Sequence, residues 1–233
     1  MSTPWLSVKD LAQQIGRDAR DIEKLVQRGR IPGRKINGEW QFHPQEVTRW
    51  LETEIPEATS KELTAIEVGQ APSDEVEQFR LTNYLTIDTI AVPLEARTKR
   101  SVLETLLEVA GRTWQVWAPA RVLEAIIDRE NALPTNLGNG IAIPHPRNPM
   151  PDDLGQTVVS FGRTYSAVPF GGGGQTMPSL FFMVLSRDTP THLRILARLG
   201  RMIQVDGFID TLGGLETPEE VFDYLSLIDA KLG

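Results

Sequence analysis

Apolar positions at helical spacing and polar capping residues divide the first segment of the chain into short helices. Ser7 followed by Asp10 predicts a capping box at the start of a helix, and Gly16 predicts its end. Apolar residues at helical spacing from Ile22 predict a second helix that ends near Gly29. Two short helices with a tight turn between them are typical of a helix-turn-helix.

A hairpin and a third helix follow these two. Asn37-Gly38 lies between Arg34–Ile36 and Glu39–Phe42, and Asn-Gly is the dipeptide most typical of a two-residue hairpin turn. Pro44 suits the first position of a helix, where a backbone N–H has no partner within the helix. The order helix, turn, helix, hairpin, helix predicts a winged helix-turn-helix domain over residues 1–52.

Residues 53–78 have the composition of a linker. They hold seven acidic residues, one lysine and two prolines, with few large apolar side chains. Because such a segment buries little apolar surface, we expect an acidic linker and assign it no secondary structure.

The larger segment, residues 79–233, mixes apolar runs of strand length with stretches of helical spacing. The run Leu180–Leu185 is apolar throughout, which is typical of a strand at the centre of a sheet. Four consecutive glycines at 171–174 predict a flexible loop. The expected class of this domain is α/β, a mixed sheet covered by helices, after the small winged helix-turn-helix domain. Strands are expected at 85–92, 157–161 and 180–185, and helices over 102–110, from Pro119, over 192–205 and from Pro218.

The composition excludes several kinds of functional site. The chain of 233 residues has no cysteine, which excludes disulfides, thiolate zinc sites and cysteine catalysis. Three histidines without cysteine argue against a metal site, and no Walker or dinucleotide pattern is present, so no cofactor is expected. The chain has no apolar run of about 18 or more residues, so no membrane span is expected. The N-terminus lacks the features of a signal peptide, so a cytoplasmic location is expected.

Charge is distributed unevenly along the chain. Residues 1–52 hold nine basic and seven acidic residues, whereas the remainder holds fifteen and twenty-four. Such asymmetry indicates different partners for the two halves. In the first segment, basic and amide side chains fall on the second helix, the turn and the wing, with which winged helix-turn-helix proteins reach DNA. The alternative is a solvated basic face on a protein-interaction module. The candidate DNA-binding residues are Arg20, Lys24, Gln27, Arg28, Arg30, Arg34 and Lys35.

The segment Gly138–His145 places one of the three histidines at the end of an expected strand, with prolines on both sides. A neutral imidazole is a nucleophile, and the reference pKa of about 6.5 leaves it neutral near neutral pH. Arginine suits bidentate binding of a phosphoryl group, and backbone N–H groups at the glycines add an anion nest. For direct transfer between two proteins, the ring of His145 must also be exposed.

This segment resembles the active-histidine segment of the IIA phosphocarriers of the bacterial sugar phosphotransferase system, fructose/mannitol type, including the nitrogen-regulatory branch. The resemblance runs through about residues 80–230. It implies that His145 accepts a phosphoryl group from the histidine of an HPr-type protein.

Two further stretches, Asp128–Glu130 and Thr191–Leu196, look like motifs of the same family in the expected order. They imply that Arg129 orients the phosphate and that His192 donates a hydrogen bond to it. Pro146 departs from the small residue usual in the family after the active histidine, and proline has no N–H to donate. The departure implies slower phosphorylation or a different donor.

The first segment resembles the excisionase-like, MerR-related DNA-binding family, because Trp5-Leu6, Gly29-Arg30-Ile31-Pro32 and Trp40-Gln41-Phe42 sit at the family's usual places. The two resemblances together favour a nitrogen-regulatory type of phosphocarrier with a DNA-binding module. One alternative is a sugar-relay component that passes phosphate to a separate IIB partner. Another is a protein that keeps the IIA fold, binds without being phosphorylated, and carries Pro146 as a mark of lost chemistry.

Overall fold

The computed structural model describes residues 5–71, 79–172 and 176–233, so the loop predicted at 171–174 falls partly outside the described residues. The contacts group into two units. The first contains residues 1–77 and 193–204, and the second contains residues 78–192 and 205–233. Helix α7 (Thr189–Ile203) therefore starts in the second unit and continues in the first.

The first two helices follow the predicted capping signals. Helix α1 (Val8–Ile15) begins where the Ser7 hydroxyl accepts the Asp10 N–H at 3.2 Å and the Asp10 carboxylate accepts the Ser7 N–H at 2.9 Å. The hydrogen bond from the Ser7 N–H lowers the pKa of Asp10. The helix ends at Gly16 in the left-handed conformation, with φ of 60°, and α2 (Ala19–Gln27) follows. Both helices confirm the prediction.

A three-stranded antiparallel sheet completes the helix-turn-helix. Its order is β1-β3-β2, with β1 (Leu6–Ser7), β2 (Arg34–Ile36) and β3 (Glu39–Phe42). The Asn-Gly turn has positive φ at both residues, 53° and 89°, as a type I′ hairpin requires. The two-residue strand β1 is absent from the sequence-based expectation because it is too short to alternate. Helix α3 (Pro44–Glu54) has its proline at the first position, as predicted.

The structure differs from the linker predicted over residues 53–78. Helix α4 (Ser60–Gly69) lies inside it and begins in a capping box, where the Thr59 N–H donates to the Glu62 carboxylate at 2.9 Å and lowers the pKa of that group. The acidic composition led to the wrong prediction here, because two of the acidic residues have structural roles in this helix. Glu62 serves as a cap, and Glu67 is only 5% exposed because it is paired.

Glu67 joins α4 to α7 within the first unit. Its two carboxylate oxygens accept hydrogen bonds from Arg198 and from Arg201, the second at 2.9 Å. Arg198 is fully buried and Arg201 is 9% exposed. The two helices also pack closely, since a Cβ on Gly200 would lie 3.0 Å from the side chain of Leu63. We call Glu67, Arg198 and Arg201 the buried ionic cluster.

Gly69 allows α4 to approach α1. A Cβ at this position would lie 2.4 Å from the carbonyl oxygen of Gln14 and 2.5 Å from that of Gln13, so the backbone would have to move. Gly69→Ala is therefore expected to lower the free energy of unfolding by about 1–3 kcal/mol, measured by urea denaturation. Gly111→Ala is the control, because no atom lies within 4 Å of the added methyl. Equal losses in both variants would contradict the close approach.

The second unit contains a four-stranded mixed sheet in the order β4-β6-β7-β5. Its strands are β4 (Ile90–Ala91), β5 (Asn139–Ala142), β6 (Val158–Arg163) and β7 (Thr176–Leu185). β6 and β7 are antiparallel, whereas β4 with β6 and β5 with β7 are parallel. The apolar strand β7 is internal, as predicted. The strand predicted at 85–92 is wrong except at its end, because much of that stretch forms a 3-10 helix.

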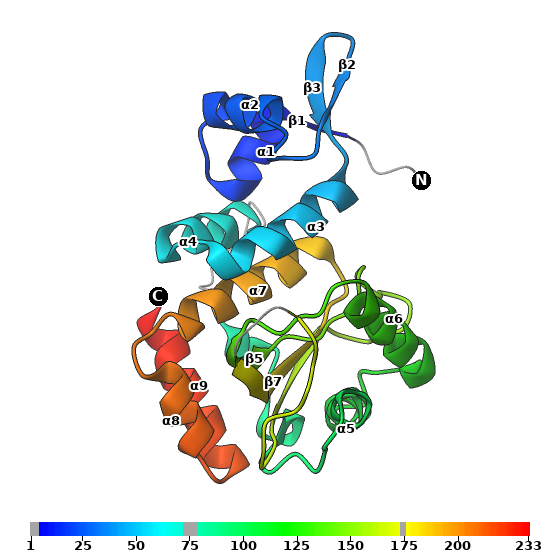
Figure 1. The fold of residues 1–233 in the computed structure, drawn as a ribbon, viewed down its shortest axis with the longest axis vertical. Helices are drawn as coiled ribbons and strands as arrows, with labels where there is room; N and C mark the ends of the chain where they lie inside the picture. Colours follow the sequence, from blue (N-terminus) through cyan, green and yellow to red (C-terminus); the bar gives the residue numbers. More distant parts are fainter. Residues whose placement is uncertain (1–4, 72–78, 173–175) are drawn as a thin grey trace. The chain divides into compact units, whose positions relative to one another are not determined.

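Helices cover both faces of this sheet. Figure 1 shows α5 (Lys99–Gly111) and α6 (Pro119–Ala132) on one side and α8 (Phe208–Gly214) and α9 (Pro218–Lys231) on the other. Apolar side chains of α5, α6 and the strands form one core cluster. The mixed α/β class is confirmed, and α8 was not predicted. Short 3-10 helices span Ile55–Glu57, Leu81–Asn83 and Ile87–Thr89.

Candidate functional site

His145 lies three residues beyond the end of strand β5. The backbone holds this extension against its neighbours, because the Val184 N–H donates to the Pro144 carbonyl at 3.0 Å and the Ile143 N–H donates to the Thr135 carbonyl at 3.2 Å. The position of His145 at the end of a strand agrees with the sequence-based expectation.

The hydrogen bond of the His145 ring fixes which ring nitrogen carries the proton of the neutral imidazole. Nδ1 lies 2.7 Å from the carbonyl oxygen of Ile143. A carbonyl oxygen accepts only, so Nδ1 carries the proton of the neutral ring. In the neutral ring the lone pair therefore belongs to Nε2.

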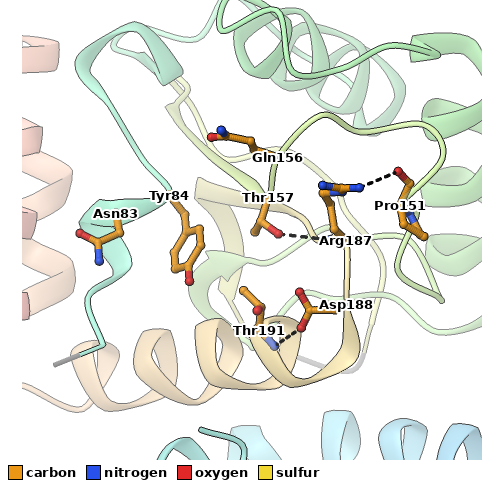
Figure 2. Close-up of a pocket in the computed structure, with 8 residues that line it drawn as sticks. All are labelled: Asn83, Tyr84, Pro151, Gln156, Thr157, Arg187, Asp188 and Thr191. Atoms are coloured by element: carbon orange, nitrogen blue, oxygen red, sulfur yellow. Dashed lines mark hydrogen bonds between the residues drawn. The ribbon is translucent and has the colours of Figure 1, made fainter. Parts of the chain in front are cut away.

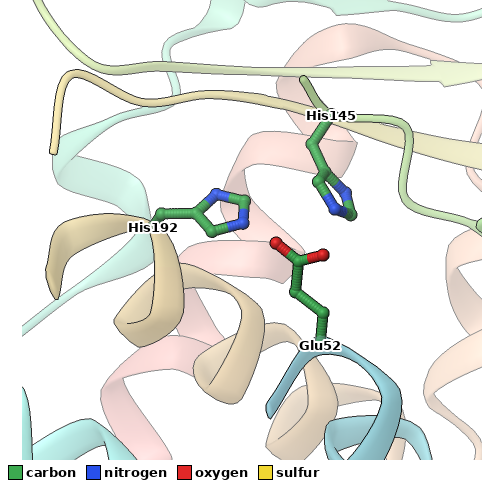
Figure 3. A group of neighbouring side chains, drawn as sticks. All are labelled: Glu52, His145 and His192. Atoms are coloured by element: carbon green, nitrogen blue, oxygen red, sulfur yellow. The ribbon is translucent and has the colours of Figure 1, made fainter. Parts of the chain in front are cut away.

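The structure places His192 beside His145. Figure 3 shows the two rings facing one another, and their centroids are 5.0 Å apart with an angle of 58° between the ring planes. His192 lies in the first turn of α7, and its Nδ1 is 3.5 Å from the hydroxyl of Ser186, just after β7. Two histidines that are 47 positions apart in the printed sequence thus share one site.

The expected exposure of His145 is wrong for this conformation. His145 is 3% exposed and His192 is 4% exposed. Pro144 and Pro146, on either side of His145, are themselves buried, and the imidazole of His192 lies beside the His145 ring.

Arg129 lies in the last turn of α6 and is 7% exposed. Its Nη1 donates to the carbonyl oxygen of Leu133, so the guanidinium closes the turn that leaves the helix. A role in orienting phosphate stays a prediction for this residue.

The seven candidate DNA-binding residues are all exposed. Arg20, Lys24 and Gln27 recur every three or four positions and share one face of α2, opposite the buried Ile22 and Val26. The remaining four are Arg28 and Arg30, after α2, and Arg34 and Lys35, on β2.

Part of this basic set has partners within the domain. Lys24 pairs with Asp21 at 3.1 Å, and Arg34 pairs with Glu46 at 3.2 Å. All four of these side chains are largely exposed or half-buried, so the pairs are weak and open to exchange for phosphate. Over the described residues, no ion pair engages Arg28 or Arg30.

Comparison with known families decides the classification. The model of the EIIA 2 family of the phosphoenolpyruvate-dependent sugar phosphotransferase system matches residues 83–227, more than half of the chain. The chain belongs to this EIIA type 2 family. A helix-turn-helix domain model matches residues 5–54.

Individual relatives agree with this family. The chain is 28% identical to the fructose-specific EIIA component of Haloferax volcanii over 142 residues, which are 60% of this chain and 90% of that protein. It is 26% identical to the fructose-specific EIIABC component of Bacillus subtilis, over 65% of this chain but only 24% of that longer protein. The crystal structure of nitrogen regulatory protein IIA-Ntr from Neisseria meningitidis superposes with a TM-score of 0.55 at 27% identity, covering 61% of this chain and 97% of that one.

Sequence reasoning missed Glu130 as a support of the EIIA site. This carboxylate is 1% exposed, pairs with Lys99 at 2.9 Å, and accepts the Thr135 N–H at 3.3 Å. Because the Thr135 carbonyl in turn accepts the Ile143 N–H, Glu130 positions the segment that leads to His145. The sequence predicts a role for the adjacent Arg129, but no spacing rule pairs Glu130 with a lysine from another helix.

A cavity of about 530 Å³ lies next to the start of α7 in the second unit. Figure 2 shows the Thr191 N–H donating to the Asp188 carboxylate and Arg187 donating to Thr157 and Pro151. These polar groups already hold the loop before His192, so we assign the cavity no ligand. Over the described residues, no helix has the length and apolar character needed to cross a membrane.

Proposed function

We propose that this chain is a phosphocarrier and regulator of the nitrogen-regulatory type, which accepts a phosphoryl group on His145 from an HPr-type protein and binds DNA through its helix-turn-helix. The observation that carries the proposal is the pair of imidazoles 5.0 Å apart, one of them with Nδ1 fixed by a backbone carbonyl. Membership of the EIIA type 2 family supports it.

The transfer step follows from the ring geometry. Nε2 of His145 attacks the phosphorus of the phosphohistidine on the donor protein, the new N–P bond forms, and the N–P bond to the donor imidazole breaks. The donor ring takes up one proton and the phosphorylated His145 ring gives one up, both exchanged with solvent, so that both rings end neutral. The phosphoryl group adds about −1.5 to −2 charges at the site, by analogy with other phosphorylated side chains.

His192 stabilises the transferred group by a hydrogen bond. When the Ser186 hydroxyl donates to Nδ1 of His192, the proton of the neutral His192 ring resides on Nε2, which is then a donor to a phosphoryl oxygen. Arg129 is the proposed cation for the remaining charge. Pro146 supplies no N–H, so the side-chain donors are more important here than in a site with a backbone donor after the histidine.

The test of the carrier function is incubation of the whole chain with phosphoenolpyruvate, enzyme I and an HPr-type protein. We expect incorporation of one phosphoryl group, seen by intact mass at mildly basic pH because phosphohistidine is acid-labile. No incorporation from either the sugar-type or the nitrogen-type HPr would overturn it and leave a binding protein that keeps the fold. Onward transfer to a separate IIB would instead identify a component of a sugar relay.

DNA binding is tested through its salt dependence. Affinity for a random-sequence duplex, measured by fluorescence anisotropy between about 50 and 200 mM salt, reports the number of neutralised phosphates as a slope of about −0.9 for each. Arg28→Ala and Arg30→Ala are each expected to reduce the magnitude of this slope by about one. Lys61→Ala, at an exposed position of α4, is the matched control and is expected to leave the slope unchanged. Wild-type slopes in both arginine variants would exclude these residues from the interface.

A further inference from the structure

The loop between α5 and α6 exposes two tryptophans on one surface of the second unit. Trp114 is 86% exposed and Trp117 is 62% exposed. Both side chains line a groove of about 610 Å³ between the two helices, together with apolar residues that include Leu107 and Leu123. Large indoles are mostly buried in folded proteins, so two of them in one exposed groove indicate an interaction surface.

This exposure does not arise from a loose loop. The backbone N–H of Trp117 donates to the Asp153 carbonyl at 2.9 Å, and the backbone N–H of Gly155 donates to the Gln115 carbonyl at 2.7 Å. The ring of Trp117 also packs over Gly155, where an added Cβ would lie 2.8 Å from it. The backbone therefore holds the groove in one shape before any partner arrives.

Trp114 has a strained backbone. Its φ is 61°, in the left-handed region that bulky side chains rarely adopt. The backbone N–H of Trp114 donates to the Gly111 carbonyl at 2.9 Å, which fixes this conformation. Glycine or asparagine would suit the position better for folding alone, and strain of this kind is typical of residues kept for binding.

The charge of the groove selects its occupant. Glu104 and Glu108 are its charged lining residues, with no lysine or arginine among the described residues that line it. Glu104 pairs with Arg100 at 2.7 Å, whereas Glu108 is in no ion pair within the described chain. Carboxylates and the faces of indole rings both attract cations. A second copy of the same surface would bring like charges together, which disfavours self-association through it.

We propose that this groove docks a segment of another protein that presents a lysine or arginine among apolar side chains. The apolar side chains pack on the two indoles, and the cation lies between an indole face and Glu108. The inference is independent of phosphoryl transfer, because none of the groove residues belongs to the histidine site.

The test uses two short, fluorescein-labelled synthetic peptides with the same leucine and alanine positions, one with arginines and one with glutamates between them. Anisotropy with the full chain is expected to give at least about tenfold tighter binding of the arginine peptide, with loss of that binding in Trp114→Gly and Trp117→Ala. Trp114→Gly relieves the positive φ, so its melting temperature is expected to equal or exceed that of the wild type. This separates lost binding from lost folding.

Glu108→Gln is expected to weaken the arginine peptide by a few-fold and to reduce its salt dependence. Tyr165→Ala is the control, because Tyr165 is 76% exposed but does not line the groove. Equal affinity for both peptides, absence of binding, or an equal effect of the control overturns the proposal. A tryptophan-dependent dimer in sedimentation velocity would overturn it in favour of a second copy of this chain.

Discussion

Replacing His145 with alanine is expected to abolish phosphoryl uptake from the HPr-type donor. The substitution removes Nε2, the nitrogen left with a lone pair once Nδ1 donates to the Ile143 carbonyl at 2.7 Å. Without a nucleophile no N–P bond forms, so the expected loss is complete rather than graded. The measurement is intact mass after incubation with phosphoenolpyruvate, enzyme I and HPr, with circular dichroism to verify folding.

Two other histidine variants separate the nucleophile from its neighbours. His192→Ala removes one donor to the phosphoryl group and is expected to slow uptake by about 100-fold without abolishing it. His43→Ala is the control, because His43 lies before α3 in the other unit and makes no side-chain capping hydrogen bond. Full incorporation into the His145 variant would place the phosphoryl group elsewhere and contradict the assigned site.

Replacing Glu67 with glutamine is expected to destabilise the first unit by about 3–5 kcal/mol. The substitution keeps the shape of the side chain but leaves Arg198 and Arg201 buried without their shared carboxylate. Removing one partner of a buried ionic group costs far more than losing a surface ion pair, because the remaining charges are cut off from water. Urea denaturation followed by circular dichroism measures the loss.

The control for this variant is Glu54→Gln, at the exposed end of α3, which is expected to change stability by less than about 0.5 kcal/mol. The buried ionic cluster would lose its assigned importance if Glu67→Gln cost no more than this control. A second variant, Glu67→Ala, is expected to cost at least as much, because it adds a cavity to the loss of the shared carboxylate.

Local signals predicted most of the elements. These signals each act over a few residues, so the sequence alone is enough to predict their effect. They include the Ser7–Asp10 capping box, the Asn37-Gly38 turn and the prolines that begin helices. The α/β class and the internal strand β7 followed from runs of apolar residues. The position of His145 after a strand followed in the same way.

Features that depend on distant partners were not predictable. The sequence around Glu67 is typical of a linker, because its partners Arg198 and Arg201 lie more than a hundred positions later in the chain. Glu130 likewise needs Lys99 from another helix. The burial of the two histidines depends on three-dimensional packing, which the spacing of residues in a motif does not encode.

Helix α7 has a consequence for dividing this chain into pieces. Because residues 193–204 group with residues 1–77, a cut near position 78 yields no fragment with an intact first unit. A fragment that starts at residue 79 retains Arg198 and Arg201 but lacks the Glu67 carboxylate that pairs with both of them. The matching N-terminal fragment retains that carboxylate without its arginines. The family match over residues 83–227 thus contains residues that group with the first unit, and the EIIA-like part is to be studied in the whole chain.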